Sequence, residues 1–162
     1  MAVGSVLIAL QASRDDGRGV TSAEFLDPLS IRPGEVEAVK ADGERWTAGL
    51  VYFAVVRYSA FDHVDTSEDA GAQSEAFFAG VVDAFRGAAR FLDQRPPSVT
   101  AAMRAAGLSL RLFVDVRMDQ DQMELELPPE LLAACGQHGL GVYVISNDIS
   151  FAEALEARRS TR

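Results

Sequence analysis

Five acidic residues lie close together in the sequence and are the group best suited to chemistry: Asp115, Asp119, Asp121, Glu124 and Glu126. Carboxylate oxygens are the ligands that Ca²⁺ and Mg²⁺ prefer, so a shared site could serve metal-assisted hydrolysis. The glycine and closing glutamate of a calcium-binding loop are missing, however, and Arg111 and Arg117 can pair with the carboxylates instead. We therefore expect a solvated, partly paired surface, with a small metal-dependent hydrolase or ligand-binding enzyme as the alternative.

The other residue types that often carry catalysis lie where a structural role is expected. Cys135 falls on the apolar stripe of a predicted helix, where a thiol is usually buried and inert. His63 lies in an acidic loop, and His138 lies at a helix end, where the helix dipole favours a positive charge. The loop from Gly17 to Gly19 lacks the third glycine and the lysine of phosphate-binding loops. We therefore expect no catalytic residues, no metal and no cofactor.

Composition limits the classes of partner. The 162 residues suit one domain, and a hydrophobic share of 48% is ample for one core. Lys and Arg total 15 against 24 Asp and Glu, a formal charge of -9, which repels nucleic acid and favours a basic protein partner. No apolar run reaches the roughly 20 residues that cross a membrane as a helix. A single cysteine excludes an internal disulfide and is consistent with a cytoplasmic location.

Two runs of alternating residues must position the carboxylates. From Leu108 to Met118 every second residue is apolar, which predicts a strand with one buried face. After the polar residues 119–122, Met123, Leu125 and Leu127 alternate with glutamates. We therefore predict a hairpin whose second strand returns along the first and shares its apolar and solvent faces.

The first half of the chain is predicted to hold strands and one short helix. Thr21 and Glu24 have the spacing of a capping box, which predicts a short helix that Pro28 ends. The long apolar run from Leu50 to Ala60 predicts a central strand, buried on more of its surface than the hairpin. The predicted elements are a strand at 3–12, the helix at 22–26, turns at 32–34 and 42–43, strands at 35–40 and 50–60, and a loop at 61–71.

The second half contains the main helix. From Gln73 to Gln94 the apolar period changes to that of a helix, and one stripe gathers Phe77, Phe78, Val81, Val82, Phe85, Ala88, Ala89 and Leu92. Three shorter helices are predicted. The first is capped by Ser98 and closed by Gly107. The second is opened by Pro128 and Pro129, has Leu131, Leu132 and Cys135 on its stripe and ends at Gly139, and the third runs from Phe151 to Arg158. A strand is predicted at 140–146.

These elements predict an α+β domain, with helices packed on one face of a mostly antiparallel sheet and a ferredoxin-like core. We place this single domain at residues 1–148. Residues 149–162 are predicted to form a C-terminal tail with a short helix.

Three stretches carry a family resemblance: Leu110-Arg-Leu-Phe-Val-Asp-Val, Glu126-Leu-Pro-Pro-Glu-Leu-Leu and His138-Gly-Leu-Gly-Val-Tyr-Val. Together they resemble the C-terminal half of the bacterial family called domain of unknown function 4279. Phe25-Leu26 followed by Ile31-Arg-Pro-Gly-Glu resembles that family's short helix and proline turn, whereas Trp46 sits earlier than the family's tryptophan, which lies within the middle strand. The resemblance spans roughly residues 5–146 and implies a fold without implying an activity or functional residues.

The remaining candidate is a surface for binding. Phe113 lies among charged residues on the solvent face of the predicted hairpin, as an aromatic anchor ringed by charges does in partner-binding patches. We therefore predict a small acidic non-enzymatic binding protein, of the immunity or antitoxin type, that neutralises a basic partner. In the alternative, the helix from Phe151 covers Phe113. The predicted contact residues are Phe113, Asp115, Arg117, Glu124 and Glu126.

Overall fold

The computed structural model describes residues 4–14, 16, 18–32, 40–41, 51–59, 70–118 and 124–148. Strands and helices alternate irregularly along this part of the chain, which confirms the predicted α+β class. The elements are β1 (Gly4–Ser13), α1 (Ser22–Leu26), β2 (Lys40–Ala41), β3 (Val51–Ser59), α2 (Ala70–Asp93), α3 (Pro97–Ala105), β4 (Ser109–Met118), α4 (Pro129–His138) and β5 (Gly141–Asp148).

The strands form one mixed sheet in the order β2-β3-β1-β4-β5. β1 is antiparallel to both β3 and β4, β2 is antiparallel to β3, and β5 alone is parallel to its neighbour, β4. A parallel pair requires a crossover, and α4 supplies it. The order β2-β3-β1-β4 is the one a ferredoxin-like core has, but α1 comprises only five residues and β2 only two. The ferredoxin-like core therefore stays a prediction.

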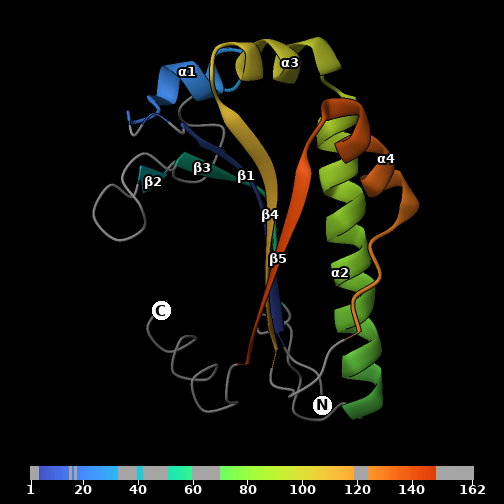
Figure 1. Ribbon diagram of the computed structural model, residues 1–162. Helices are drawn as coiled ribbons and strands as arrows, with labels where there is room; N and C mark the ends of the chain where they lie inside the picture. The colour runs from blue at the N-terminus through green and yellow to red at the C-terminus, as the bar shows by residue number, and fades with distance from the viewer. Residues whose placement is uncertain are drawn as a thin grey trace.

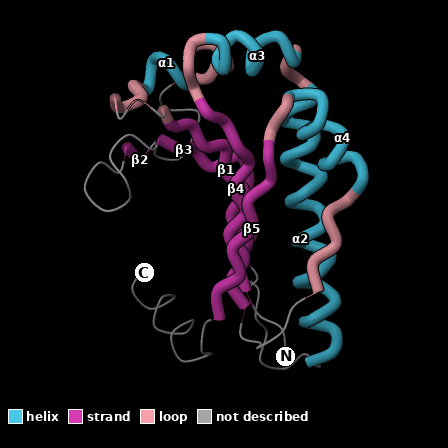
Figure 2. The backbone as a smooth tube through the Cα atoms, viewed as in Figure 1, coloured by secondary structure: helices cyan, strands magenta, loops and turns pink. Residues whose placement is uncertain are grey.

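The helices lie to one side of the sheet and across one of its ends. Figure 1 shows α2 running along one face, with α4 beside it, while α1 and α3 lie across the end of the sheet. The tube in Figure 2 shows the same layers by secondary structure. No helix in the described part of the chain lies on the other face. We call the face against α2 the helix face, and the face that carries Gln11, Phe113, Asp115 and Tyr143 the open face.

The core lies between α2 and the middle of the sheet. Ile8 and Leu10 of β1 and Leu112 and Val114 of β4 are fully buried on the helix face, as is Phe85 of α2. The strand predicted at 50–60 is an interior strand, but the prediction that it is buried on more of its surface than the strand at 108–118 was wrong for the described side chains. β3 lies between β2 and β1, and its described side chains from Ala54 onward are half-buried or exposed. An unbroken apolar run shows burial on both faces only if both faces are covered, and here one face lacks a described helix.

The helix ends follow the predicted signals, with one exception. In α1, the Glu24 amide donates to Thr21 Oγ1 at 3.2 Å and the Thr21 amide donates to Glu24 Oε2 at 2.9 Å, which completes the predicted capping box. Gly107 and Gly139 have φ of 86° and 62°, the left-handed values expected after α3 and α4. Ser98, however, is not a cap, because α3 begins at Pro97 with Pro96 as its N-cap and no side-chain cap hydrogen bond.

Two residues of the predicted stripes face water. The α2 stripe is buried at Phe77, Val81 and Phe85, but Phe78 is 39% exposed. On α4, Leu131 is fully buried whereas Leu132 is 49% exposed. Each exposed residue directly follows a buried one. It therefore lies about 100° around the helix from that buried neighbour, at the margin of the packed stripe.

The predicted hairpin was wrong in its second half. β4 is confirmed, but its two neighbours in the sheet are β1 and β5, so no strand from 123–127 pairs with it. Residues 124–128 are irregular and lead into α4. Leu125 and Leu127 are half-buried against the core while Glu124 and Glu126 are exposed, so the alternation arises from packing and not from a strand.

Several predictions concern residues outside those that the structure describes. They are the turns at 33–34 and 42–43, most of the strand at 35–40, the loop at 61–69 with His63, the acidic residues Asp119 and Asp121, and the tail with its helix from Phe151.

Candidate functional site

The open face is built from residues of four strands. β1, β4 and β5 pair residue by residue, and β3 pairs with β1 on either side of a register shift between Ile8 and Ala9, so their outward side chains form rows across the sheet. One row joins Gln11, Arg111 and Gly141; the next joins Ala54, Ala9, Phe113 and Tyr143; the third joins Arg57, Leu7, Asp115 and Ile145. Along β4 the face therefore reads Arg111, Phe113, Asp115, Arg117.

An aromatic pair occupies the middle row. The rings of Phe113 and Tyr143 are stacked, with centroids 6.1 Å apart and an interplanar angle of 22°. Tyr143 is 46% exposed, while Phe113 is half-buried. The predicted contact residue Phe113 is thus on the open face, and the sequence analysis missed its partner, because strand pairing between β4 and β5 was not predicted. The sequence contained part of the signal, since Tyr143 is the one aromatic residue of the strand predicted at 140–146.

Arg111 is held in place by two neighbours from the flanking strands. Its Nε donates to Gln11 Oε1 at 2.7 Å, and its Cζ lies 4.7 Å from the centroid of the Tyr143 ring. Gln11 is only 5% exposed, whereas Arg111 is exposed. Across the sheet stands Gly141, where an added Cβ would meet nothing within 4 Å, so the arginine has room to lie over the tyrosine. A cation over an aromatic face is stabilised by the ring's quadrupole.

Asp115 and Arg117 form an ion pair along β4. Arg117 Nε and Nη2 both lie 3.1 Å from Asp115 Oδ2, and the aspartate side chain is 11% exposed against 55% for the arginine. The predicted pairing of arginines with carboxylates is therefore correct for this pair. It runs along one strand, however, instead of across two.

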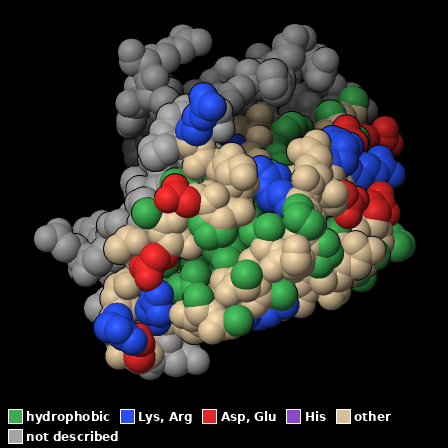
Figure 3. Space-filling model, turned by 90° about the horizontal axis from the view of Figure 1, so that it is seen from above, with side chains coloured by type: hydrophobic (Ala, Val, Ile, Leu, Met, Phe, Trp, Pro, Cys, Tyr) green, Lys and Arg blue, Asp and Glu red, His purple; other side chains and the backbone are tan. Residues whose placement is uncertain are grey.

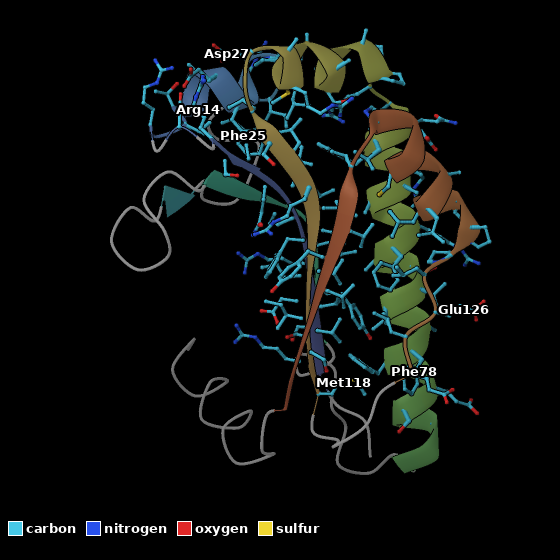
Figure 4. All side chains as sticks on the ribbon, viewed as in Figure 1. Arg14, Phe25, Asp27, Phe78, Met118 and Glu126 are labelled. Carbon is cyan, nitrogen blue, oxygen red and sulfur yellow. The ribbon has the colours of Figure 1, made fainter. Side chains whose placement is uncertain are left out.

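The other predicted contact residues are not on the open face. Glu124 and Glu126 belong to the segment that leads into α4, whose Leu125 and Leu127 pack against the core. Figure 4 shows Glu126 pointing outward from the helical layer, away from the sheet. Within the described residues, no group of three or more His, Cys, Asp and Glu side chains is close enough to hold a metal ion.

Cys135 and His138 have structural roles in the core. Cys135 is 2% exposed, and burial raises the pKa of its thiol to about 11. His138 is 1% exposed, with Nε2 3.0 Å from the Leu92 carbonyl oxygen and Nδ1 3.2 Å from Thr100 Oγ1. Arg104 donates to the His138 carbonyl oxygen. This network joins the ends of α2 and α4 to α3. The part played by Thr100 could not be predicted from the sequence, because its partners lie on other helices.

In the loop after β1, the charged residues Asp16 and Arg18 pair with each other. The amide of Arg18 donates to Asp16 Oδ1 at 3.0 Å and its Nε donates to Oδ2 at 2.8 Å. These hydrogen bonds lower the pKa of Asp16 below its usual value, first through the backbone amide and then through the side chain. The arginine of this loop therefore binds the chain's own carboxylate.

Charge is balanced over the described surface. The side chains that the structure describes include ten arginines and ten carboxylates, whereas the whole sequence has 15 Lys and Arg and 24 Asp and Glu. The net charge of -9 therefore lies entirely in the remaining residues. Figure 3 looks onto the end covered by α1 and α3. It shows apolar side chains surrounded by both basic groups, in blue, and acidic groups, in red. On the open face, arginines outnumber the one described carboxylate, Asp115.

None of the helices within the described ranges is both long and apolar enough to cross a membrane. Comparisons with models of known protein families, with curated proteins and with solved structures found no match. The resemblance to domain of unknown function 4279 therefore stays a prediction.

Proposed function

We propose that this protein is a non-enzymatic binding protein and that the open face of the sheet is its contact surface. The observation that carries the proposal is the stacked pair of the half-buried Phe113 and the exposed Tyr143, with Arg111 over the tyrosine ring. Tyrosine and arginine are the residue types over-represented at the energetic centres of protein interfaces. Both aromatic rings lie on paired strands, so little conformational freedom is lost when a partner covers them.

The alternative of a hydrolase has less support. Its carboxylates would have to converge, but Asp115 is paired with Arg117 on the open face and Glu126 points outward from the helical layer. Asp115 and Glu126 therefore lie on different sides of the molecule.

The expectation of a basic partner, of the immunity or antitoxin type, also stays a proposal. It draws its support from the net charge of -9, which steers a basic protein at long range. That charge belongs to residues outside the described side chains, so it does not define the chemistry of the open face itself.

The test compares two phenylalanines on opposite sides of the molecule. Tagged wild type, Phe113→Ala and Phe78→Ala are used to recover a partner from extracts of the native cell, and dissociation from the recovered partner is then measured. Phe78 is the matched control because it is an exposed phenylalanine on α2. We expect Phe113→Ala to raise the dissociation rate about tenfold or more and Phe78→Ala to leave it within about twofold. Equal effects would remove the open face as the contact surface.

A further inference from the structure

We infer that Arg111 binds a carboxylate of the partner, and that the partner presents an extended acidic segment whose carboxylate lies two residues from an apolar side chain. This inference rests on the proposed function, because it assigns the chemistry of one part of the same open face. The net charge of the chain alone suggests a basic partner. At the open face, the inference instead assigns an acidic segment to the partner.

The first support is that the positive charge of Arg111 is not neutralised within the described residues. Arg14, Arg18, Arg86 and Arg117 each form an ion pair with a carboxylate, whereas Arg111 forms none within the described residues. Its hydrogen bond through Nε goes to the neutral amide of Gln11. A guanidinium has five N–H donors in a rigid fork, and the fork matches the two oxygens of a carboxylate.

The second support is that Arg111 is positioned before any partner binds. Gln11 is buried and fixes the Nε side of the guanidinium, while the Tyr143 ring supports one of its faces. An arginine that is already oriented loses less rotamer freedom on binding than an unrestrained one. Two different strands, β1 and β5, supply these contacts to a residue on β4 between them.

The contrast with Arg117 strengthens the assignment. Both arginines belong to β4 and face the same side, but Arg117 is paired with Asp115, two residues away on its own strand. The residue two positions from Arg111 on the same side is Phe113. Of these two arginines, only Arg111 therefore lacks a carboxylate and lies beside an apolar side chain, that of Phe113.

A carboxylate fits this arrangement better than a phosphate. A phosphate group carries close to two negative charges and is commonly held by several cations or by a helix N-terminus. Here Arg111 is the one arginine of β4 that lacks a carboxylate, so a single guanidinium faces the ligand. A single negative charge matches a single arginine.

The spacing of the rows defines the segment. Residues two apart in an extended chain point to the same side about 6.6 Å apart, which is also the spacing of Arg111 and Phe113 along β4. A partner segment that runs along β4 therefore places an acidic side chain over Arg111 and the next residue on that side over Phe113 and Tyr143. The pattern Asp or Glu, any residue, then an apolar or aromatic residue is the expected ligand.

The probe is a blocked peptide that repeats Glu-Ser-Phe-Ser, titrated into the ¹⁵N-labelled protein. We expect shifts of the Arg111 Nε–H and Tyr143 signals, with saturable binding below about 1 mM. Arg111→Gln should weaken binding about tenfold or more. Arg90→Gln, the same charge change at an exposed position of α2, should change it by less than about twofold. A peptide with Lys in place of Glu that binds as well or better would overturn the inference, as would absence of saturable binding.

A second variant supplies the carboxylate from within the chain. Gln11→Glu places an acid at the position that already contacts Arg111 Nε, so it should compete with the peptide and weaken binding about tenfold while the melting temperature stays near that of wild type. Gln11→Glu with unchanged affinity would contradict the inference. If Phe113→Ala and Tyr143→Leu weaken binding but Arg111→Gln does not, the assignment to Arg111 fails and the proposed function survives. If none of the three matters, the proposed function fails as well.

Discussion

The two sides of β4 are built from the same ten residues but differ in what holds them. On the helix face, Leu112, Val114 and Val116 are fully buried among apolar side chains. On the open face, Arg111 and Arg117 are each fixed by a specific polar partner, and Phe113 is stacked on one ring. Packing on the first side is non-directional and tolerates few changes in volume, whereas contacts on the second are directional and can be exchanged for contacts with a partner.

The largest stability effect should come from the helix face. Phe85→Ala removes a fully buried ring from the core and should lower the free energy of unfolding by about 3 to 5 kcal/mol. The matched change Phe78→Ala, on the same helix but 39% exposed, should cost less than about 1 kcal/mol. Urea denaturation of both variants measures the difference. Equal losses would show that the two sides of α2 do not differ in packing as described.

The thiol of Cys135 tests how tightly α4 closes the helix face. With its pKa raised to about 11, only about one thiol in a thousand is ionised at pH 8, and the residue is 2% exposed. Alkylation of the folded protein should therefore be slow, and its rate should rise as pH increases toward the pKa. Unfolding in urea should expose the thiol and permit rapid labelling. Fast labelling of the native protein at pH 8 would contradict this burial.

A smaller effect is expected where polar contacts are themselves buried. Thr100→Val keeps the shape of the side chain but removes the hydroxyl. Its oxygen lies within hydrogen-bond distance of His138 Nδ1 and of the Pro97 and His138 carbonyl oxygens, and its single proton is donated to one of these groups. The substitution should cost about 1 to 3 kcal/mol because these buried groups lose a partner. Ser98→Ala, on the same helix but outside any cap hydrogen bond, should be close to neutral. Thermal unfolding compares the two variants.

The smallest effect on the proposed interface should come from the two glutamates that were first expected to belong to it. Glu124→Lys with Glu126→Lys lies on the helical side, so it should change the dissociation rate of a recovered partner by less than about twofold, although long-range steering can change the association rate. The reference is Phe113→Ala. A dissociation rate as fast as that of Phe113→Ala would place part of the interface on the segment before α4.

The sequence was informative wherever the pattern was local. β1, α1, α2 and β4 follow from alternation, a capping box or a helical stripe, because neighbours along the chain determine those features. The second hairpin strand failed because Leu125 and Leu127 alternate for a different reason, namely that an irregular segment packs one side against the core. The contact from Arg111 to Gln11 joins residues 100 positions apart, and strand order alone brings them together. The sequence carries no short-range signal for such a contact.

The position of β1 at the centre of the sheet also has a consequence for protein synthesis. β1 is synthesised before one of its two partners, β4, which begins about a hundred residues later, at Ser109. A ribosome that adds about 5 to 20 residues per second leaves one hydrogen-bonding edge of β1 without β4 for several seconds or more. We expect the nascent N-terminal segment to depend on β3, on the ribosome surface or on a chaperone until β4 emerges, and the finished chain to fold slowly for its size, as long-range pairings require.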